Sequence, residues 1–216
     1  MSEESPSSDR ITELRIQGMR ALADVRLPMG GLTALIGENG SGKSTLIEAL
    51  ELLRRAGSPG NFVNDQLGPF HGGLESLLRK GDKSLRVRLT IEGGDSPLDY
   101  ALALSRQGNR TSVSEEHLLA GLNATNGQQA ILMRDSASCE ALDVRSGQRT
   151  SLNVDPGALA LAAVLASQGT SAHPEALDRW LMRYRGVGDL RAQGFAPHVF
   201  HEIARKERTA LYSARV

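Results

Sequence analysis

Disulfides, net charge and long apolar runs are all missing from this sequence of 216 residues. Its single cysteine, Cys139, excludes a disulfide within the chain and is typical of a buried thiol in the reducing cytosol. Basic and acidic residues number 25 each, so the overall charge favours neither nucleic acid nor a membrane surface as the partner. The longest apolar stretch, residues 158–166, is too short to span a bilayer. We therefore expect a soluble, cytoplasmic protein.

A glycine-rich stretch matches the phosphate-binding loop (Walker A) pattern G-x-x-x-x-G-K-[ST] at every fixed position. Residues 32–36 before it predict a strand, and the apolar spacing of residues 44–55 after it predicts a helix. Strand, loop and helix are the arrangement that phosphate binding needs. The alternative, a glycine-rich turn that binds nothing, is disfavoured by the Lys-Ser pair. The residues of the stretch are Gly37, Glu38, Asn39, Gly40, Ser41, Gly42, Lys43, Ser44 and Thr45.

The residue types in this stretch suit the binding of ATP with Mg²⁺. Glycines allow backbone N–H groups to wrap around a phosphate, where a Cβ would obstruct them. Lys43 supplies a cation that reaches the β- and γ-phosphates, which makes it the candidate catalytic residue. The Ser44 hydroxyl is a candidate ligand of Mg²⁺, and the helix points its positive end at the anion. We predict that all nine residues contact a nucleoside triphosphate.

Alternating apolar and polar residues predict an antiparallel β meander around this loop. Turns rich in Gly, Asn and Asp separate the strands. Two strands precede the loop, whereas Rossmann-type and kinase folds usually open with the loop strand itself. The expected strands are residues 11–16, 22–27, 85–91, 98–104 and 111–117, with further candidates at 130–133 and 141–145.

Other segments are expected to lie outside the sheet. Residues 56–73 predict a loop, and residues 74–80 predict one or two helical turns. Asp155-Pro156 is typical of a helix start, with the acidic residue as the cap and proline at the first helical position. A second helix is expected from Pro174.

Three parts of the chain follow from this pattern. Residues 1–9, rich in Ser and Glu, predict a disordered lead-in without a secretory signal. Residues 10–154 predict a nucleotide-binding lobe that contains the loop and an antiparallel insert. Residues 155–216 predict a helical segment.

The segment Gly18-Met19-Arg20-Ala21-Leu22 follows the first predicted strand and precedes the glycine-rich loop. In both stretches the chain resembles RecF/SMC-type ATPases, a group that includes relatives of the OLD family. The glycine-rich loop fits the group's form G-x-N-G-[SA]-G-K-[ST]. Residues 73–78 and 100–104 also resemble bacterial predicted ATPases of this kind. The resemblance runs through most of the chain, but the loop alone is highly specific.

This resemblance implies an α/β fold, namely a P-loop NTPase head of the ABC type. Such a head has a mixed sheet with an antiparallel edge, and a helical lobe carries the signature motif. Two heads sandwich ATP and complete each other's sites, which implies a homodimer. A glutamine between the lobes senses the γ-phosphate through Mg²⁺ and water, and Gln168 is its positional match here. The alternative for Gln168 is an exposed loop residue.

Two motifs that hydrolysis requires in this group are missing from the sequence. A Walker B strand has four apolar residues, an Asp for the Mg²⁺ shell and a Glu that polarises the attacking water. Residues 131–135 come nearest, but Arg134 interrupts the apolar run and Ser136 replaces the Glu, so a hairpin strand is favoured. Residues 104–108 resemble the signature L-S-G-G-Q in letters alone, because they lie at a predicted strand-to-turn junction.

Three functions stay open on the sequence. The first is the ATP-binding head of a RecF/SMC/OLD-like ATPase that couples ATP binding and hydrolysis to head dimerisation in DNA repair, chromosome maintenance or phage defence. The missing motifs predict an incomplete head, which hydrolyses ATP poorly unless a second chain supplies the rest; DNA contact stays open. The second is a non-hydrolysing nucleotide-binding interaction module. The third, a phosphotransferase acting on a small molecule, is disfavoured by the two strands before the loop.

Overall fold

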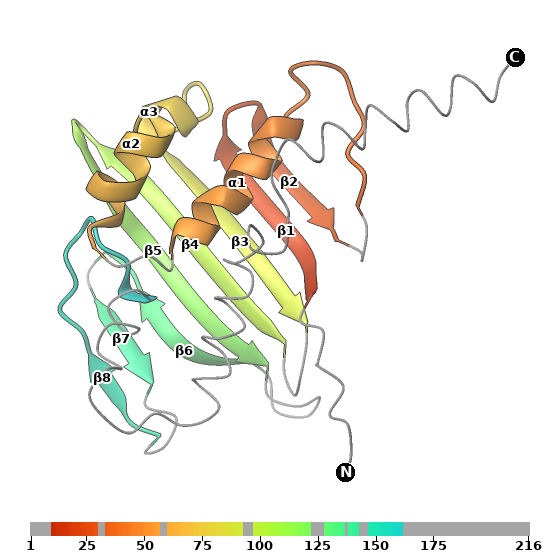
Figure 1. Cartoon of the computed structure of the whole chain (residues 1–216). Coiled ribbons are helices and arrows are strands. Elements are labelled where there is room, and N and C mark those ends of the chain that lie inside the picture. The colour runs from red at the N-terminus through yellow and green to blue at the C-terminus, as the bar shows by residue number, and fades with distance from the viewer. Residues whose placement is uncertain are drawn as a thin grey trace, which may run out of the picture.

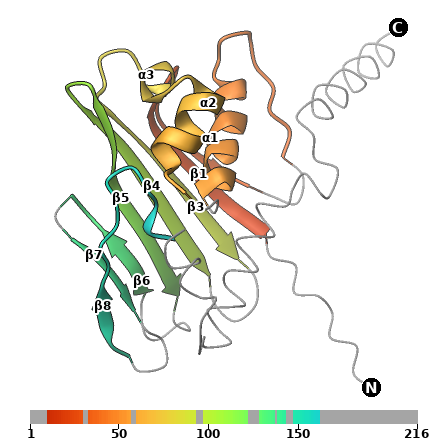
Figure 2. The same ribbon diagram turned by 60° about the vertical axis from the view of Figure 1, so that its left-hand side comes forward.

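A single twisted β-sheet with helices on one face forms the part of the chain that the structure describes (Figures 1 and 2). The structure is a computed structural model, and it describes residues 10–29, 33–56, 60–92, 97–121, 128–136, 138–142 and 147–161. A search of these residues finds no helix with the length and apolar character needed to cross a membrane.

Eight strands make up the sheet, in the order β2-β1-β3-β4-β5-β6-β7-β8, and every pair among them is antiparallel. The α/β class and the antiparallel meander are confirmed, and the meander continues one strand further than the sequence indicated. The mixed sheet that the resemblance implied would need a parallel pair of strands, and the described strands contain none. The strands are β1 (Arg10–Met19), β2 (Leu22–Pro28), β3 (Ser84–Glu92), β4 (Leu98–Gln107), β5 (Arg110–Gly121), β6 (Gln128–Arg134), β7 (Cys139–Leu142) and β8 (Arg149–Ser151).

Alternation of apolar side chains determines which face of the sheet the helices cover. In β3, every second residue from Leu85 to Ile91 is buried. The register places Val87 beside Ile16 of β1 and Leu102 of β4, so the apolar rows of adjacent strands share one face. Burying each large apolar side chain contributes about 1.5–3 kcal/mol, which makes this face the main source of stability.

Helical segments pack against that apolar face, as Figure 2 shows for α1, α2 and α3. They contribute buried side chains such as Leu52, Phe62 and Leu77 to the same core as the strands. The elements are α1 (Lys43–Ala56), the π-helix η1 (Phe62–Leu67), α2 (Gly68–His71) and α3 (Leu74–Leu77). The helix predicted over residues 44–55 is confirmed.

The loop predicted over residues 56–73 is wrong in its described part, because η1 and α2 lie there. The residues that suggested a loop instead begin and end the helices. The Asn61 side chain caps η1 by accepting a hydrogen bond from the N–H of Asn64. Proline stands at the start of α2, and Gly72, with φ 68°, ends it. Caps and loops use the same residue types, so composition did not separate them.

The strand predicted over residues 32–36 is not formed by residues 33–36, which have no regular secondary structure. The edge strand of the sheet, β2, pairs with β1 alone among the described strands. A strand requires a hydrogen-bonded ladder with a neighbour, and no such ladder joins residues 33–36 to a described strand. Ile36 is consequently 88% exposed despite its apolar side chain.

The helix start predicted at Asp155-Pro156 is also wrong, because these residues form a turn. The Asp155 carboxylate accepts hydrogen bonds from the Gly157 N–H (2.7 Å) and the Asn61 side chain (3.0 Å). Residues 160 and 161 are the first helical ones. The helices and Gln168 expected further along lie outside the described residues, and the three-part division of the chain stays a prediction.

A buried carboxylate of the sheet takes over the capping role that Asp155 was expected to have. Glu116 of β5 is fully buried and accepts hydrogen bonds from the N–H groups of Ala160 (2.6 Å) and Leu161 (2.9 Å) and from the Tyr100 hydroxyl (2.9 Å). Burial raises the pKa of Glu116, and these hydrogen bonds and nearby Arg134 oppose that effect.

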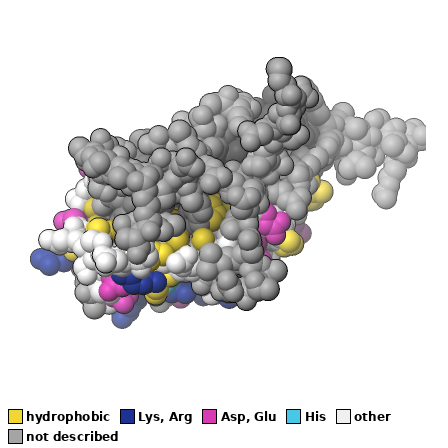
Figure 3. Space-filling model, turned by 90° about the horizontal axis from the view of Figure 1, so that it is seen from below, with side chains coloured by type: hydrophobic (Ala, Val, Ile, Leu, Met, Phe, Trp, Pro, Cys, Tyr) yellow, Lys and Arg dark blue, Asp and Glu magenta, His cyan; other side chains and the backbone are white. Residues whose placement is uncertain are grey.

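Cross-strand ion pairs cover the opposite face of the sheet. The Arg15–Asp24 pair lies at 2.7 Å and the Arg88–Asp99 pair at 3.0 Å. Hydrogen bonding from Arg15 lowers the pKa of Asp24, as expected for a paired carboxylate. Further pairs join Arg26 to Glu13 and Arg86 to Glu115. Basic and acidic side chains also lie near one another on the described surface seen from below (Figure 3).

We predict that Glu116 makes the stability of the protein depend on pH in a direction opposite to that of most carboxylates. Because its pKa is raised in the folded state, that state binds the proton more tightly than the unfolded chain does. This stabilisation is fully present below the unfolded pKa and is lost as pH rises through the folded pKa. Glu116→Gln should remove this component, as measured by denaturant unfolding across a pH series.

Glu115→Gln is the matched control for this measurement, because Glu115 is the neighbouring residue and its ion pair with Arg86 lies at the surface. We expect Glu115→Gln to change the free energy of unfolding by about 1 kcal/mol or less and to keep the wild-type pH profile near and above the unfolded pKa of Glu116. Identical pH profiles for wild type and Glu116→Gln would contradict the prediction.

Candidate functional site

The glycine-rich loop leads directly into the first turn of α1, and residues 36–41 are exposed. Gly40 (φ 84°) and Gly42 (φ 95°) have left-handed backbone conformations, which cost little for glycine and more for any residue with a Cβ. The two glycines therefore allow the sharp change of direction between the loop and the helix.

Lys43 places its ammonium group against the inside of this loop. The Nζ atom donates hydrogen bonds of 2.6 Å to the carbonyls of Gly37 and Glu38 and lies 3.4 Å from the Ser41 hydroxyl. The loop thus folds around a positive charge. The first N–H groups of α1, which have no partner within the helix, add the positive end of the helix dipole. An anion is the ligand that this arrangement favours.

Ser44 and Thr45 have different surroundings in the first turn of α1. Ser44 is exposed, so its hydroxyl is accessible to a cation bound together with a phosphate. Thr45 is 5% exposed, which leaves its backbone N–H as the group that can contribute to a loop site. Within the described ranges, no cluster of three or more His, Cys, Asp or Glu residues could hold a metal ion. Of the two hydroxyls, the one of Ser44 is therefore the one accessible to such a cation.

The turn between β1 and β2 supports the loop from the side. A Cβ added to Gly42 would lie 2.4 Å from Cδ2 of Leu22, so the two residues pack in contact. Gly18, at the other end of the turn region, has φ 69°, and a Cβ there would lie 2.5 Å from the Ser84 carbonyl oxygen. These close approaches give a physical reason for the glycines at both positions.

Comparisons with known proteins relate this geometry to a group of ATPases. The family described as "AAA domain, putative AbiEii toxin, Type IV TA system" matches residues 32–119, which include the loop and α1. An OLD nuclease of Thermus scotoductus is 37% identical over 62 residues, and the DNA replication and repair protein RecF of Brucella abortus is 28% identical over 130 residues. This chain resembles part of a RecF/OLD-like ABC-type ATPase head. The resemblance predicted from the sequence is confirmed.

The chain spans a minor part of these relatives. The OLD nuclease match covers 25% of this chain and 12% of the relative, and the RecF match covers 47% and 32%. A solved structure described as "Structure of the recombination mediator protein RecF-ATP in RecFOR pathway" is 21% identical, with a TM-score of 0.38, and covers 55% of this chain and 30% of that chain.

Residues 131–135 came nearest to a Walker B motif in the sequence, and residues 104–108 came nearest to the signature motif. Neither stretch has the structure that its motif requires. Residues 131–135 lie largely in β6, which pairs antiparallel with β5 and β7, so the prediction of a hairpin strand is confirmed. Arg134 is buried there and donates hydrogen bonds to the carbonyls of Asp155 (3.0 Å) and Ala158. Residues 104–108 form the end of β4 and a turn, as predicted.

The single cysteine is buried within the sheet. Cys139 is buried at the start of β7, which confirms the prediction of a buried thiol. Burial raises its pKa, so the reactive thiolate is disfavoured at neutral pH.

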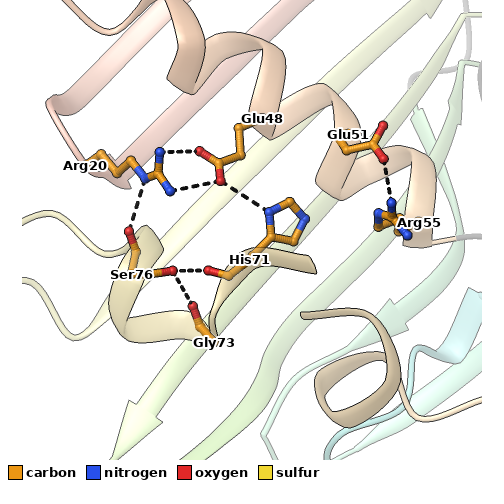
Figure 4. A network of polar contacts seen from close by, with 7 residues as sticks. All are labelled: Arg20, Glu48, Glu51, Arg55, His71, Gly73 and Ser76. Carbon is orange, nitrogen blue, oxygen red and sulfur yellow. Dashed lines mark hydrogen bonds and ion pairs between the residues drawn. The ribbon is translucent and has the colours of Figure 1, made fainter. Parts of the chain in front are cut away.

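A polar network that sequence reasoning missed joins α1 to the β1–β2 turn (Figure 4). Glu48 of α1 accepts hydrogen bonds from Arg20 of the turn and contacts His71 of α2. Arg20 also donates to the carbonyl of Ser76 in α3 (3.1 Å). The signal in the sequence was Arg20 itself, which stands in the Gly18–Leu22 segment shared with the RecF/SMC-type group. Sequence reasoning gave it no partner because the contacts come from residues 28 to 56 positions away.

We predict that Gly42→Ala destabilises the fold more than Gly40→Ala does. Both substitutions place a Cβ at positive φ, which costs about 1–2 kcal/mol. At Gly42 the Cβ also meets Leu22, whereas at Gly40 it meets nothing within 4 Å. Chemical unfolding of the two variants should separate the contact from the backbone effect. Equal losses of unfolding free energy would show that the contact with Leu22 contributes nothing.

Proposed function

We propose that this chain is the ATP-binding part of a RecF/OLD-like ABC-type ATPase head. The observation that supports the proposal most directly is the position of the Lys43 ammonium within the exposed glycine-rich loop, at the amino end of α1. A phosphate tail combines several negative charges with oxygen acceptors, which suits both the ammonium and the N–H groups there. The match of residues 32–119 to an AAA domain agrees with this ligand.

In the proposal, different groups of the loop bind the phosphates and the Mg²⁺ ion of Mg²⁺-ATP. Backbone N–H groups from Gly37 to Thr45 surround the phosphates, and Lys43 contacts the β- and γ-phosphates. Ser44, which is exposed, is the Mg²⁺ ligand within the described residues. Gln168 is the proposed second magnesium contact, and it lies outside the described residues.

The proposal extends from ATP binding to ATP hydrolysis and dimerisation of the head. The described residues contain no apolar strand that ends in Asp-Glu, so the catalytic glutamate and the signature motif must come from elsewhere in a complete enzyme. A partner chain that carries these motifs would supply them, because a second copy of this chain would lack them as well. The name of one relative, a DNA replication and repair protein, favours a role in DNA repair, whereas chromosome maintenance and phage defence stay predictions from the sequence.

A non-hydrolysing nucleotide-binding module is the second candidate, because it requires the loop and nothing that the described residues lack. It predicts ATP binding without turnover. Contact with DNA is a separate question, and the paired charges on the outer face of the sheet give it no electrostatic support. The cytoplasmic location stays a prediction.

Lys43→Ala tests the proposed function. We expect the dissociation constant for Mg²⁺-ATP to rise about 10- to 100-fold, because hydrogen bonds to a charged group contribute about 1.5–3 kcal/mol. Isothermal titration calorimetry provides the measurement, and Lys80→Ala, which removes an exposed lysine outside the loop, is the control. Equal affinity of wild type and Lys43→Ala would overturn the proposal. Phosphate release from wild type above the Lys43→Ala level would favour the ATPase over the non-hydrolysing module.

A further inference from the structure

We propose that Glu48 is a positioning residue for the phosphate-binding loop, which it holds in place through Arg20 and His71. The inference rests on the proposed function, since it assigns a role in ATP binding to a side chain that is not itself part of the loop. It also assigns a function to the segment from α2 to α3, which would otherwise serve only to cover the sheet.

Glu48 lies four residues after Ser44, so it is one helical turn further along the same side of α1. Both of its carboxylate oxygens are held by the Arg20 guanidinium, with distances of 2.7 Å from NH1 to Oε2 and 3.0 Å from NH2 to Oε1. A two-point contact of this kind fixes direction as well as distance. It therefore limits rotation of α1 about its own axis, which a single hydrogen bond would not do.

Arg20 is itself fixed before it reaches Glu48. Its backbone has φ 48°, an unusual left-handed conformation for a residue with a side chain. Its N–H donates to the Leu77 carbonyl (2.9 Å), and its Nε donates to the Ser76 carbonyl (3.1 Å). The guanidinium is thus preorganised by α3, and α3 and α1 are joined through one side chain.

His71 holds Glu48 from another direction (Figure 4). Its side chain is 4% exposed, and its Nδ1 lies 3.2 Å from Oε1 of Glu48. The other ring nitrogen, Nε2, is buried without a hydrogen-bond partner among the described residues. The contact with Glu48 is therefore the ring's one polar anchor there, and it fixes the ring's orientation. The Ser76 hydroxyl donates to the His71 carbonyl and so ties α2 to α3.

These contacts act on the same part of α1 as the contact between Leu22 and Gly42. Leu22 holds the residue just before the helix, and Arg20 holds the helix one to two turns later. Lys43 and Ser44 lie between the two points of support. A shift or rotation of α1 would move the Lys43 ammonium away from its position inside the loop, because both belong to one rigid helix.

Glu51 offers a matched control on the same helix. It pairs with Arg55 at 2.9 Å, an ion pair between residues four apart on α1, and Arg55 also contacts Gln66 of η1. Glu51→Gln therefore removes a charge and an ion pair of α1 that Figure 4 shows apart from the Arg20–Glu48 contact. Arg20→Lys is a second, milder test, because an ammonium keeps the charge but cannot reproduce the two-point contact.

The experiment measures Mg²⁺-ATP affinity by calorimetry and the melting temperature for each variant. We expect Glu48→Gln and Arg20→Lys to raise the dissociation constant at least about fivefold at a temperature where both are folded, and Glu51→Gln to change it less than twofold. A purely structural role would lower the melting temperature and leave the affinity unchanged. Amide hydrogen exchange provides a second readout: ATP should slow exchange at residues 72–78 in wild type and not in Glu48→Gln.

The failures of the inference and of the proposed function are distinguishable. Wild-type binding that Lys43→Ala abolishes, together with equal affinities for Glu48→Gln and Glu51→Gln, would overturn the inference alone. Absence of ATP binding in wild type, or equal binding by Lys43→Ala, would overturn both. If Glu48→Gln does not fold, Arg20→Lys replaces it in both the affinity and the exchange measurements.

Discussion

Contact between the β1–β2 turn and the start of α1 determines where the candidate site lies. Leu22 occupies the space that the absent side chain of Gly42 leaves, and Arg20 binds the carboxylate of Glu48. The strand β1, which pairs with both β2 and β3, holds this turn in the sheet. The sheet thus provides a rigid support for a loop that is itself exposed, and the ammonium of Lys43 depends on that support for its position.

Two buried polar residues of β5 and β6 hold the segment that follows β8 against the sheet. Glu116 and Arg134 are neighbours across β5 and β6, and both are buried. Together they bind the carbonyls of residues 155 and 158 and the N–H groups of residues 160 and 161. Buried charges require such partners, because an unpaired one would be costly to remove from water. The segment after β8 is therefore attached to the sheet through its backbone as well as through buried side chains such as Leu159 and Leu161.

Much of this fold was predictable from residue periodicity, and the exceptions have physical causes. Strand alternation indicated seven of the eight strands, and the loop pattern located α1 to within a residue or two at each end. η1 and α2 were missed because Asn61 and Gly72 serve as caps in a stretch that looks like a loop. The helix start at Asp155 was misplaced because a distant residue, Glu116, provides the cap. The loop residues were predictable as a local pattern, whereas the contacts of Glu48 join segments far apart in the chain.

The strand order also has a consequence for how the chain folds. Strands β3 to β8 are joined as successive hairpins, so their contacts form between residues close in sequence. The pair β1–β3, in contrast, encloses residues 20–83, which carry β2, the loop, α1 and the short helices. Closing this long connection has a larger entropic cost than closing a hairpin, because the paired residues are far apart in sequence. A ligand that binds the loop only when β1 and β3 are paired would stabilise the folded chain by mass action, which couples ligand concentration to the completion of folding.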